Sequence, residues 1–587
     1  MSDVPLTLAD ATAQLTAPGQ MFEVERANVL GVEMRVWKHA PTNLRQVLDL
    51  SLRHSSKDFL VYETQRLTFD DHYRAAATFA RRLVDLGVTK GDRVAIAARN
   101  LPQWAIGFWG AIIAGAVAVP LNAWWTSEEL HYGLSDSAAA FAIVDEERLE
   151  RVRPLLDKLS DLRTVAVISD DPARRPDLGE AHHRVAIIDF GALVSEAAPD
   201  ATPPEIEIGP DDDATMFYTS GTTGHPKGAV GTHRNAITNM MNLFFIGQRA
   251  AVRFGAGKPG DGNAPNSSLL NVPLFHATGC LAVMVTNTAA GGKLVMMHHF
   301  DPAGALSLVE RERITTIGGV PTIVMQILDH PDFLKYDVSS VRSVSYGGAP
   351  APPELVKRIR KAFHLAQPSN GYGLTETSAA VAINSGPDYV AKPDSCGPAV
   401  PVCDVAIIPE GFLGDEPSED MLRGPKVTGE LWIKGPNVVR GYWRKPDETA
   451  KSFTKGWLHT GDVARLDDEG FIYIVDRSKD MIIRGGENVY SVVVEAAIFE
   501  HPDVADCAVL GLPHPTLGEE VAAVIVLRPG RRFDAEEITR HVAHRLAKFE
   551  VPTKVFFLST PLPRNPQGKV LKRELRASLL ERQDSTI

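Results

Sequence analysis

The stretch Tyr218-Thr219-Ser220-Gly221-Thr222-Thr223-Gly224-His225-Pro226-Lys227, followed by Gly228, decides how this chain is interpreted. Its glycines allow a sharp backbone turn that brings N–H groups close to an anion. Its hydroxyl groups can donate to phosphate oxygens, and Lys227 adds a positive charge. We expect a buried strand at residues 216–218 and a helix at residues 233–245, so the loop between them is suited to a nucleotide polyphosphate.

Two common nucleotide motifs differ from this loop. The P-loop needs glycine before its lysine and serine or threonine after it, whereas Lys227 follows His225-Pro226 and precedes Gly228. No GxGxxG motif opens a helix, which disfavours a dinucleotide fold. Taken alone, the stretch could also be a solvated loop that binds nothing.

Length and composition describe an ordinary globular protein of several units. The chain has 587 residues, of which 44% are hydrophobic and 23% charged, so we expect three to five units of about 150 residues each. The net charge of −12 argues against a nucleic-acid surface. The four cysteines are scattered without a CxxC pair, which predicts neither a zinc site nor a disulfide framework and favours a cytoplasmic location.

One apolar stretch could be mistaken for a membrane span. Residues 104–121 carry no charge over 18 positions, which is the lower limit for a spanning helix. Pro120 and three glycines interrupt it. We expect a core helix followed by a buried strand and no transmembrane segment, with membrane contact as the alternative. The N-terminus also lacks the basic and apolar blocks of a secretory signal.

Alternating strand and helix patterns predict an α/β fold. Strands are expected at residues 92–98, 140–144 and 164–168, and a helix at residues 68–86 with Thr68 as its N-cap. Residues 196–213 are interpreted as a surface connection, residues 253–268 as a mobile loop and residues 402–470 as β-rich. We therefore predict a large N-terminal domain (1–477) of α/β subdomains plus a β-rich subdomain. A small, mobile α+β domain (478–587) follows it.

Six further motifs follow the loop in order. They are Asn271-Val272-Pro273-Leu274-Phe275-His276, Tyr346-Gly347-Gly348-Ala349-Pro350, Asn370-Gly371-Tyr372-Gly373-Leu374-Thr375-Glu376-Thr377, Gly456-Trp457-Leu458-His459-Thr460-Gly461-Asp462, Asp476-Arg477-Ser478-Lys479-Asp480-Met481-Ile482-Ile483-Arg484-Gly485-Gly486-Glu487-Asn488 and Pro563-Arg564-Asn565-Pro566-Gln567-Gly568-Lys569. Together with the loop, they resemble the adenylate-forming superfamily of acyl- and aryl-CoA synthetases, luciferases and peptide-synthetase adenylation domains. The resemblance extends over about residues 44–579.

The resemblance implies a reaction with ATP, Mg²⁺ and coenzyme A. A carboxylate attacks the α-phosphorus of ATP, a thiol then attacks the acyl-adenylate, and no general base is needed because the acid is already ionised. The implied catalytic residues are Lys569, Glu376, Thr219 and His276, and the implied Mg²⁺ ligands are Thr219 and Glu376. The implied ATP-binding residues are Thr219, Ser220, Gly221, Thr222, Thr223, Gly224, Lys227, Gly347, Gly348, Ala349, Asn370, Gly371, Tyr372, Gly373, Thr375, Asp462 and Arg477.

Individual roles are also implied by position. Tyr372 would stack on adenine, Asp462 would hold the ribose, Arg477 would support ribose or phosphate, and Lys569 would bridge the acid and the α-phosphate. Four of the site residues have a structural alternative: a core aromatic residue for Tyr372, a helix-start carboxylate for Glu376, a turn residue for Asp462 and an exposed tail lysine for Lys569.

A rotation of the small domain between half-reactions is implied as well, because one lysine cannot serve adenylation while the same domain admits coenzyme A. Lys479 matches the hinge position. The loop of Gly485, Gly486 and Glu487 would line the thiol channel, or be a simple hairpin turn.

The acid itself is less well specified. His276 stands where amino-acid-activating relatives place an aspartate, which disfavours amino acids. The expected acyl pocket consists of His276, Asn239, Met240, Val320, Gly347 and Val381. We expect an apolar monocarboxylic acid, a fatty acid ahead of an aryl or steroid-side-chain acid. Transfer to a carrier protein or another acceptor is the alternative, and a binding protein without catalysis is a third reading. The oligomeric state is open, with a homodimer as one option.

Overall fold

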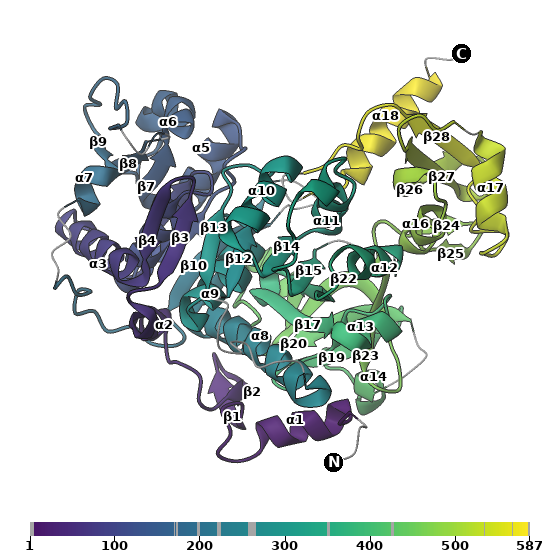
Figure 1. The fold of residues 1–587 in the computed structure, drawn as a ribbon, viewed down its shortest axis with the longest axis horizontal. Coiled ribbons are helices and arrows are strands. Elements are labelled where there is room, and N and C mark those ends of the chain that lie inside the picture. Colours follow the sequence, from purple (N-terminus) through teal and green to yellow (C-terminus); the bar gives the residue numbers. More distant parts are fainter. Residues whose placement is uncertain are drawn as a thin grey trace.

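The structure is a computed structural model that describes residues 5–169, 171, 174–195, 200–219, 225–255, 266–348, 351, 353–423, 428–532, 534–565 and 568–584. Figure 1 shows the C-terminal part (yellow) as a lobe set apart from the first α/β lobe (blue), with teal and green segments between them. The prediction of a mixed α/β fold with a large N-terminal part and a small C-terminal part is confirmed. The domain boundary after residue 477 stays a prediction.

The first lobe contains a seven-stranded sheet with the order β11-β10-β6-β5-β7-β8-β9. Its strands are β5 (Arg93–Ala97), β6 (Val117–Pro120), β7 (Ala139–Asp145), β8 (Thr164–Ile168), β9 (Ala186–Asp189), β10 (Asp213–Thr219) and β11 (Lys227–Thr232). The accompanying helices are α3 (Phe69–Asp85), α4 (Pro102–Ile113), α5 (Ser127–Asp136), α6 (Glu146–Val152), η2 (Arg153–Lys158) and α7 (Phe190–Val194).

The central sheet has eight strands in the order β17-β16-β15-β14-β12-β13-β3-β4. They are β3 (Asp58–Tyr62), β4 (Gln65–Thr68), β12 (Ser267–Leu270), β13 (Lys293–Met296), β14 (Thr316–Gly319), β15 (Ser343–Gly347), β16 (Gln367–Leu374) and β17 (Ala379–Ser385). Its helices are α2 (Leu44–Ser51), η1 (Leu52–His54), α8 (His233–Phe254), the π-helix η3 (Thr278–Val285), α9 (Thr286–Ala290), α10 (Pro302–Glu312), α11 (Pro321–Leu328), η4 (Phe333–Lys335), α12 (Pro353–Ala362), η5 (Thr375–Thr377) and α13 (Gly386–Ala391).

A β-rich region and the C-terminal lobe complete the fold. The β-rich region has the strands β18 (Gly397–Pro398), β19 (Asp404–Ile408), β20 (Gly429–Lys434), β21 (Phe453–Thr454), β22 (Trp457–Leu466) and β23 (Phe471–Arg477), with α14 (Glu419–Arg423) and α15 (Pro446–Ser452). The C-terminal lobe has β24 (Ile482–Arg484), β25 (Glu487–Val489), α16 (Ser491–Phe499), β26 (Val504–His514), β27 (Gly518–Leu527), α17 (Ala535–Ala543), β28 (Lys554–Leu558) and α18 (Lys572–Asp584). This lobe has two apolar clusters made of its own residues.

The N-terminal segment packs on the long helix α8. It forms α1 (Leu8–Thr16) and the hairpin β1 (Val24–Val29) and β2 (Val32–Trp37). Phe22 and Trp37 contact Phe245 of α8 with ring centroids 5.5 and 5.3 Å apart, respectively. Trp37 also donates its indole N–H to Asn242 Oδ1 at 2.9 Å. These contacts bring residues from the start of the chain to the middle of α8.

Local sequence signals agree with the structure of the first lobe. Thr68 and Asp71 form a reciprocal capping box at the start of α3, as expected for an N-cap threonine. The uncharged residues 104–121 form most of α4 and all of β6 and are buried. Among the described residues, no helix is both long and apolar enough to cross a membrane.

The connection around the phosphate loop differs from the expectation. Residues 227–232 form strand β11, which pairs antiparallel with β10 so that Thr219 lies opposite Lys227. The loop therefore joins two strands, and the helix follows one strand later. Small residues such as Gly228, Ala229 and Gly231 make this strand easy to overlook because they carry little strand preference. Helix α8 is also longer than predicted and ends at Gly255, which has a φ of +60°.

A buried ion pair supplies a test of the first lobe. Asp145 and Arg148 have side chains 0% and 1% exposed and lie 3.1 Å apart, and Asp145 also accepts from the Arg99 N–H. Asp145→Ala leaves a buried guanidinium without this partner, so we expect a loss of about 3–5 kcal/mol in unfolding free energy. Urea titration followed by tryptophan fluorescence measures it.

The control removes an exposed ion pair. Glu354 and Lys357 lie 3.0 Å apart with well-exposed side chains, so Glu354→Ala should cost less than about 1 kcal/mol. Equal losses for the two variants would contradict the assignment of a structural role to Asp145.

Candidate functional site

One cavity of about 1440 Å³ lies between the central sheet, the β-rich region and the C-terminal lobe. Its wall includes residues as distant in sequence as Leu15 and Lys569. Pockets for one small ligand have volumes of about 300–1,000 Å³. The cavity therefore has room for more than one small molecule.

The phosphate end of the cavity is formed by the facing ends of β10 and β11. Thr219 and Lys227 both line it. The Lys227 ammonium lies 3.3 Å from Glu448 Oε2 and 4.3 Å from the ring centroid of Tyr442. This arrangement holds a lysine at the cavity wall through one carboxylate and one aromatic face. The predicted residues Ser220, Gly221, Thr222, Thr223 and Gly224, and also Ala349, lie outside the described residues.

Glu376 lies on η5, directly after β16, and also lines the cavity. The Tyr442 hydroxyl donates to its Oε1 at 2.8 Å. Burial, followed by the Glu376 charge, raises the pKa of Tyr442, so this phenol remains a hydrogen-bond donor. A carboxylate and the Thr219 hydroxyl are the oxygen ligands that Mg²⁺ prefers, and they fit such an ion.

A second polar group lies behind the cavity wall. The Tyr372 hydroxyl donates to Asp462 Oδ2 at 2.6 Å, and Arg477 Nε lies 3.0 Å from Asp462 Oδ1. Burial, together with the Asp462 charge, raises the pKa of Tyr372. Tyr372 and Arg477 line the cavity, whereas Asp462 is only 3% exposed behind them. Asn370 is buried too, with its amide 3.9 Å from Cys396 Sγ, and does not line the cavity.

Close backbone packing explains the glycines at this wall. A Cβ on Gly347 would lie 2.5 Å from the Gly371 carbonyl oxygen, and one on Gly373 would lie 1.6 Å from the Ala379 carbonyl oxygen. The β16–β17 register shifts between Tyr372 and Gly373. Only glycine fits at these positions. The predicted residues Gly347, Gly348, Gly371, Gly373 and Thr375 all line the cavity.

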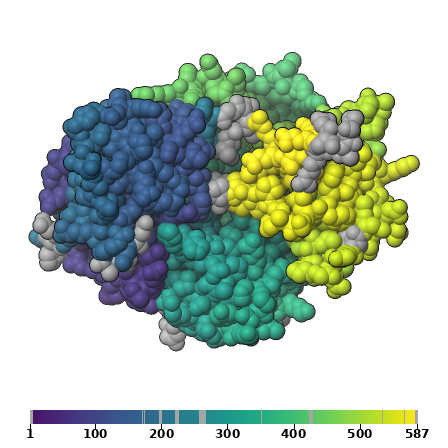
Figure 2. All heavy atoms as spheres, turned by 90° about the horizontal axis from the view of Figure 1, so that it is seen from above, coloured from purple at the N-terminus to yellow at the C-terminus, as the bar shows by residue number. Residues whose placement is uncertain are grey.

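Lys569 reaches this cavity from the C-terminal lobe. Burial, and then the nearby Arg477 and Lys479 charges, lower its pKa from 10.5 to about 8. The preceding Gly568 has a φ of +78°, and a Cβ there would lie 2.7 Å from Val320 Cγ2. Arg528 of the same lobe forms an ion pair with Asp329 at 3.2 Å. Figure 2 shows the yellow lobe lying against the teal part of the chain that contains Val320 and Asp329.

The predicted hinge and thiol-channel residues lie in different environments. Lys479 lines the cavity, and burial followed by the Arg477 charge lowers its pKa. Gly485 and Gly486 form the turn between β24 and β25 with φ of +62° and +88°. This is a tight hairpin turn. Neither glycine nor Glu487 lines the cavity.

His276 marks the other end of the cavity. Its Nδ1 hydrogen-bonds with the Thr278 hydroxyl at 3.1 Å and accepts from the Thr278 N–H at 3.3 Å. Burial lowers the pKa of His276 to about 4, so the imidazole is neutral at pH 7. Of the other predicted acyl-pocket residues, Val320 and Gly347 line the cavity.

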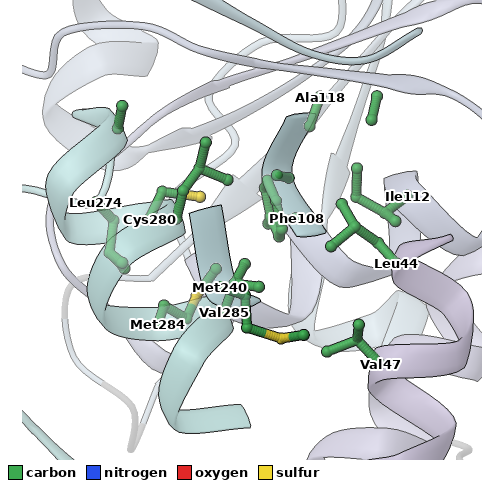
Figure 3. Packing of buried hydrophobic residues seen from close by; sticks show 14 of the residues in the cluster. Leu44, Val47, Phe108, Ile112, Ala118, Met240, Leu274, Cys280, Met284 and Val285 are labelled. Carbon is green, nitrogen blue, oxygen red and sulfur yellow. The ribbon is translucent and has the colours of Figure 1, made fainter. Parts of the chain in front are cut away.

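Three predicted pocket residues do not belong to the cavity wall. Asn239, Met240 and Val381 are at most 2% exposed and lie in the core. Asn239 accepts from the Ala380 N–H at 2.9 Å, which turns this face of α8 toward β17. Figure 3 shows Met240 among Val47, Met284 and Val285 of the apolar cluster. The expectation for these three is therefore corrected.

Other residues of α8 line the cavity instead of Asn239 and Met240. The side of α8 that lines the cavity carries Leu243, Phe244 and Ile246, which a run of apolar residues does not distinguish from core positions. Leu243 and Phe244 belong to the apolar helix face expected to contribute to the pocket, whereas Tyr442, Glu448 and the N-terminal residues Leu15, Met21 and Phe22 were not expected. Their contacts join distant segments, for example Tyr442 with Glu376 across 66 positions and Glu448 with Lys227 across 221, and no local pattern indicates them.

Comparisons with known proteins match nearly the whole chain. A family model described as "AMP-binding enzyme" matches residues 50–443, and one described as "AMP-binding enzyme C-terminal domain" matches residues 493–569. A feruloyl-CoA synthase from an Amycolatopsis species is 36% identical over 512 residues, which cover 87% of this chain and 93% of the relative. A long-chain-fatty-acid–CoA ligase from Bacillus subtilis is 34% identical over 548 residues, covering 90% and 92%.

The fold also matches solved structures. ATP-bound MatB from Rhodopseudomonas palustris is 28% identical, with a TM-score of 0.77 over 91% of this chain and 99% of the other. The match includes both the large N-terminal part and the C-terminal lobe.

The contact between Gly568 and Val320 predicts how the C-terminal lobe docks. In Gly568→Ala, the new methyl group collides with Val320 and the positive φ is strained, so residues 568–571 should lose contact with α11. Hydrogen–deuterium exchange should become at least about tenfold faster in 568–571, which corresponds to a docking loss of about 1.4 kcal/mol or more.

A matched glycine separates strain from collision. Gly530 has the same φ of +78° but no atom within 4 Å of a Cβ. Gly530→Ala should leave exchange in 568–571 unchanged. If both variants accelerate exchange in that segment equally, Gly568 does not act through contact with Val320.

Proposed function

The chain belongs to the AMP-binding enzyme family, in its acyl-CoA synthetase branch, and from this premise we propose that it joins an apolar monocarboxylic acid to coenzyme A at the expense of ATP. One observation carries the proposal: Lys569 lies in the same cavity as the phosphate-end residues Thr219 and Lys227 and the acid-end residue His276. A lysine in that position can contact both partners of a reaction between two anions.

In the first half-reaction, an oxygen of the acid attacks the α-phosphorus of ATP. A P–O bond forms to the acid, the bond to the β-phosphate oxygen breaks, and pyrophosphate leaves. Lys227 and the Thr219 hydroxyl would hold the β- and γ-phosphates, and Lys569 would draw the carboxylate and the α-phosphate together. Glu376 and Thr219 would hold Mg²⁺, which neutralises phosphate charge when bound.

Nucleoside recognition would use the polar group behind the wall. Tyr372 and Arg477 already orient the Asp462 carboxylate. A carboxylate fixed in this way can accept hydrogen bonds from two ribose hydroxyls. Tyr372 would also pack against adenine, as would the backbone at Gly347 and Gly348.

In the second half-reaction, a thiolate attacks the acyl carbon, a thioester forms and AMP leaves. Lys569 fills space at the cavity that the thiol needs, so we propose that the C-terminal lobe rotates about Lys479. The turn of Gly485, Gly486 and Glu487 would then face the site. Its two left-handed glycines allow close backbone approach to a narrow ligand.

In this proposal the acid carries no second charged group, because none of the described lining residues of α8 and η3 is charged. The lining residues of these two helices include Leu243, Phe244 and Val283. Relatives named for feruloyl and long-chain fatty acids are compatible with both aryl acids and the fatty acids favoured by the sequence. The four free, buried cysteines are compatible with a reducing, cytoplasmic setting.

Lys569→Ala should separate the two half-reactions. Because Lys569 would neutralise charge only while adenylate forms, we expect adenylation to fall at least about 100-fold, as for loss of one electrostatic contact in a transition state. Thioester formation from supplied acyl-adenylate should change less than about threefold. Pyrophosphate exchange measures the first step and thioester release the second. Equal losses in both steps would refute this division of roles.

The lowered pKa of Lys569 predicts a pH dependence. Lysine is a cation only below its pKa, so kcat/KM for ATP in adenylation should fall as pH rises through about 8. Lys569→Arg keeps a charge at this position throughout that range. Its residual activity should show no fall near pH 8. The same fall in Lys569→Arg would assign the titration to another group.

A further inference from the structure

The central sheet presents a row of hydroxyl groups to the cavity. Across β12, β14 and β15, Ser268 lies opposite Thr316, and Thr316 lies opposite Ser343. One step nearer the strand ends, Ser345 of β15 lies opposite Ser369 of β16. All five residues line the cavity. We call this set the hydroxyl floor.

The opposite face of the same strands is apolar. Leu269, Ile317 and Val344 alternate with the floor residues and pack in the core that α10, α11 and α12 cover. Side chains of successive strand residues point to opposite faces, so the hydroxyl groups are confined to the cavity side. Interior strand positions favour branched apolar residues, which makes a run of serine and threonine here unusual.

Most of these hydroxyl groups have no protein partner. Ser268 donates to Asn287 Oδ1 at 3.2 Å. Among the described residues, no side-chain hydrogen bond is made by the hydroxyls of Thr316, Ser343, Ser345 or Ser369. Ser369 is only 8% exposed. These hydroxyl groups are open to the cavity, so water or a ligand is their hydrogen-bond partner.

The roof of the cavity has the opposite character. Leu243, Phe244 and Ile246 of α8 and Ala282 and Val283 of η3 line it with apolar side chains, and Gln248 and Thr278 are the polar lining residues of these two helices. Phe22 and Met21 from the N-terminal segment add apolar surface at the far end. The acid half therefore has one face lined by hydroxyl groups and one mainly apolar face.

The floor also has a defined spacing. Ser345 is two residues and Ser343 four residues before Gly347 on β15. With about 3.3 Å per residue, they lie about 7 Å and about 13 Å along the strand from Gly347. Gly347 lies at the end of this strand that faces the nucleotide half. The row with Ser345 therefore lies beside the middle of a bound acid, and the row with Ser343 lies beside its far end.

Resting on the proposed ligase function, we propose that the preferred acid carries oxygen substituents, such as hydroxyl, ether or keto groups, along one edge. Its other edge is apolar and faces α8 and η3. A saturated chain would cover the hydroxyl floor without pairing it, which is costly for enclosed polar groups. The hydroxyl floor thus selects oxygenated acids over plain alkyl acids of the same length.

Two pairs of acids test the two rows. Para-hydroxycinnamate against cinnamate probes the row nearer Gly347, which contains Ser345. Omega-hydroxydecanoate against decanoate probes the farther row, which contains Ser343. The unaltered protein should prefer the oxygenated member of each pair by about three- to tenfold in kcat/KM, as one hydrogen bond allows. CoA-dependent AMP release measures each rate.

Alanine variants assign the preference to single residues. Ser345→Ala should abolish the preference within the cinnamate pair, and Ser343→Ala should abolish the preference within the decanoate pair. Thermal unfolding of both variants, compared with the unaltered protein, reports whether they remain folded. Ser339→Ala is the matched control because Ser339 is exposed just before β15. It should leave both ratios unchanged.

Two failures are distinguishable. Ratios near one in the unaltered protein, or ratios unaffected by Ser343→Ala and Ser345→Ala, would overturn the role of the hydroxyl floor while leaving the ligase function intact. If no acid in the panel supports CoA-dependent AMP release and none supports pyrophosphate exchange, the ligase proposal and the inference resting on it both fail.

Discussion

The convergence of positive charge at one point is the constraint on which the site depends. Arg477, Lys479 and Lys569 come together near two carboxylates, the buried Asp462 and the partly exposed Asp480. Burial and mutual repulsion lower the pKa values of both lysines, which means that the docked C-terminal lobe carries an electrostatic cost. A polyanion in the cavity relieves this cost, so docking of the lobe and binding of a polyphosphate favour each other.

The sheet beneath the site allows this convergence because its strand ends are nearly free of side chains. Gly347 and Gly373 could not carry even a Cβ without meeting a neighbouring backbone oxygen. Tight backbone packing opens space above the sheet, and that space extends from the phosphate end to η3. Removing one glycine would therefore change the cavity and the strand pairing together, so the wall tolerates little variation there.

Features that depend on neighbouring residues can be predicted from the sequence, whereas features that depend on contacts between distant segments cannot. Thr68 was identified as a cap because capping depends on residues three positions apart. The cavity-lining positions of Thr219, Glu376 and Lys569 were accessible because motifs keep these residues in recognisable surroundings. Met240 was misplaced because helical periodicity tells an apolar face from a polar one, but not a core face from a cavity face. Tyr442 could not be found, since its contact with Glu376 joins positions 66 apart.

Part of the acid half follows from the local sequence of β15. Ser343 and Ser345 alternate with Val344 and Tyr346, a pattern that puts the two hydroxyl groups on one face of a strand. What the sequence does not supply is the register that aligns Thr316 and Ser369 with them, because parallel pairing joins residues separated by whole helices. A single serine in a strand is easily satisfied by water, whereas aligned rows on one cavity wall form a surface with a chemical preference. The nucleotide half, in contrast, depends on glycines and charged residues that lie within short sequence motifs and can be identified from them. This asymmetry explains why family resemblance identifies the nucleotide readily, while the acid must be inferred from the pairing of strands.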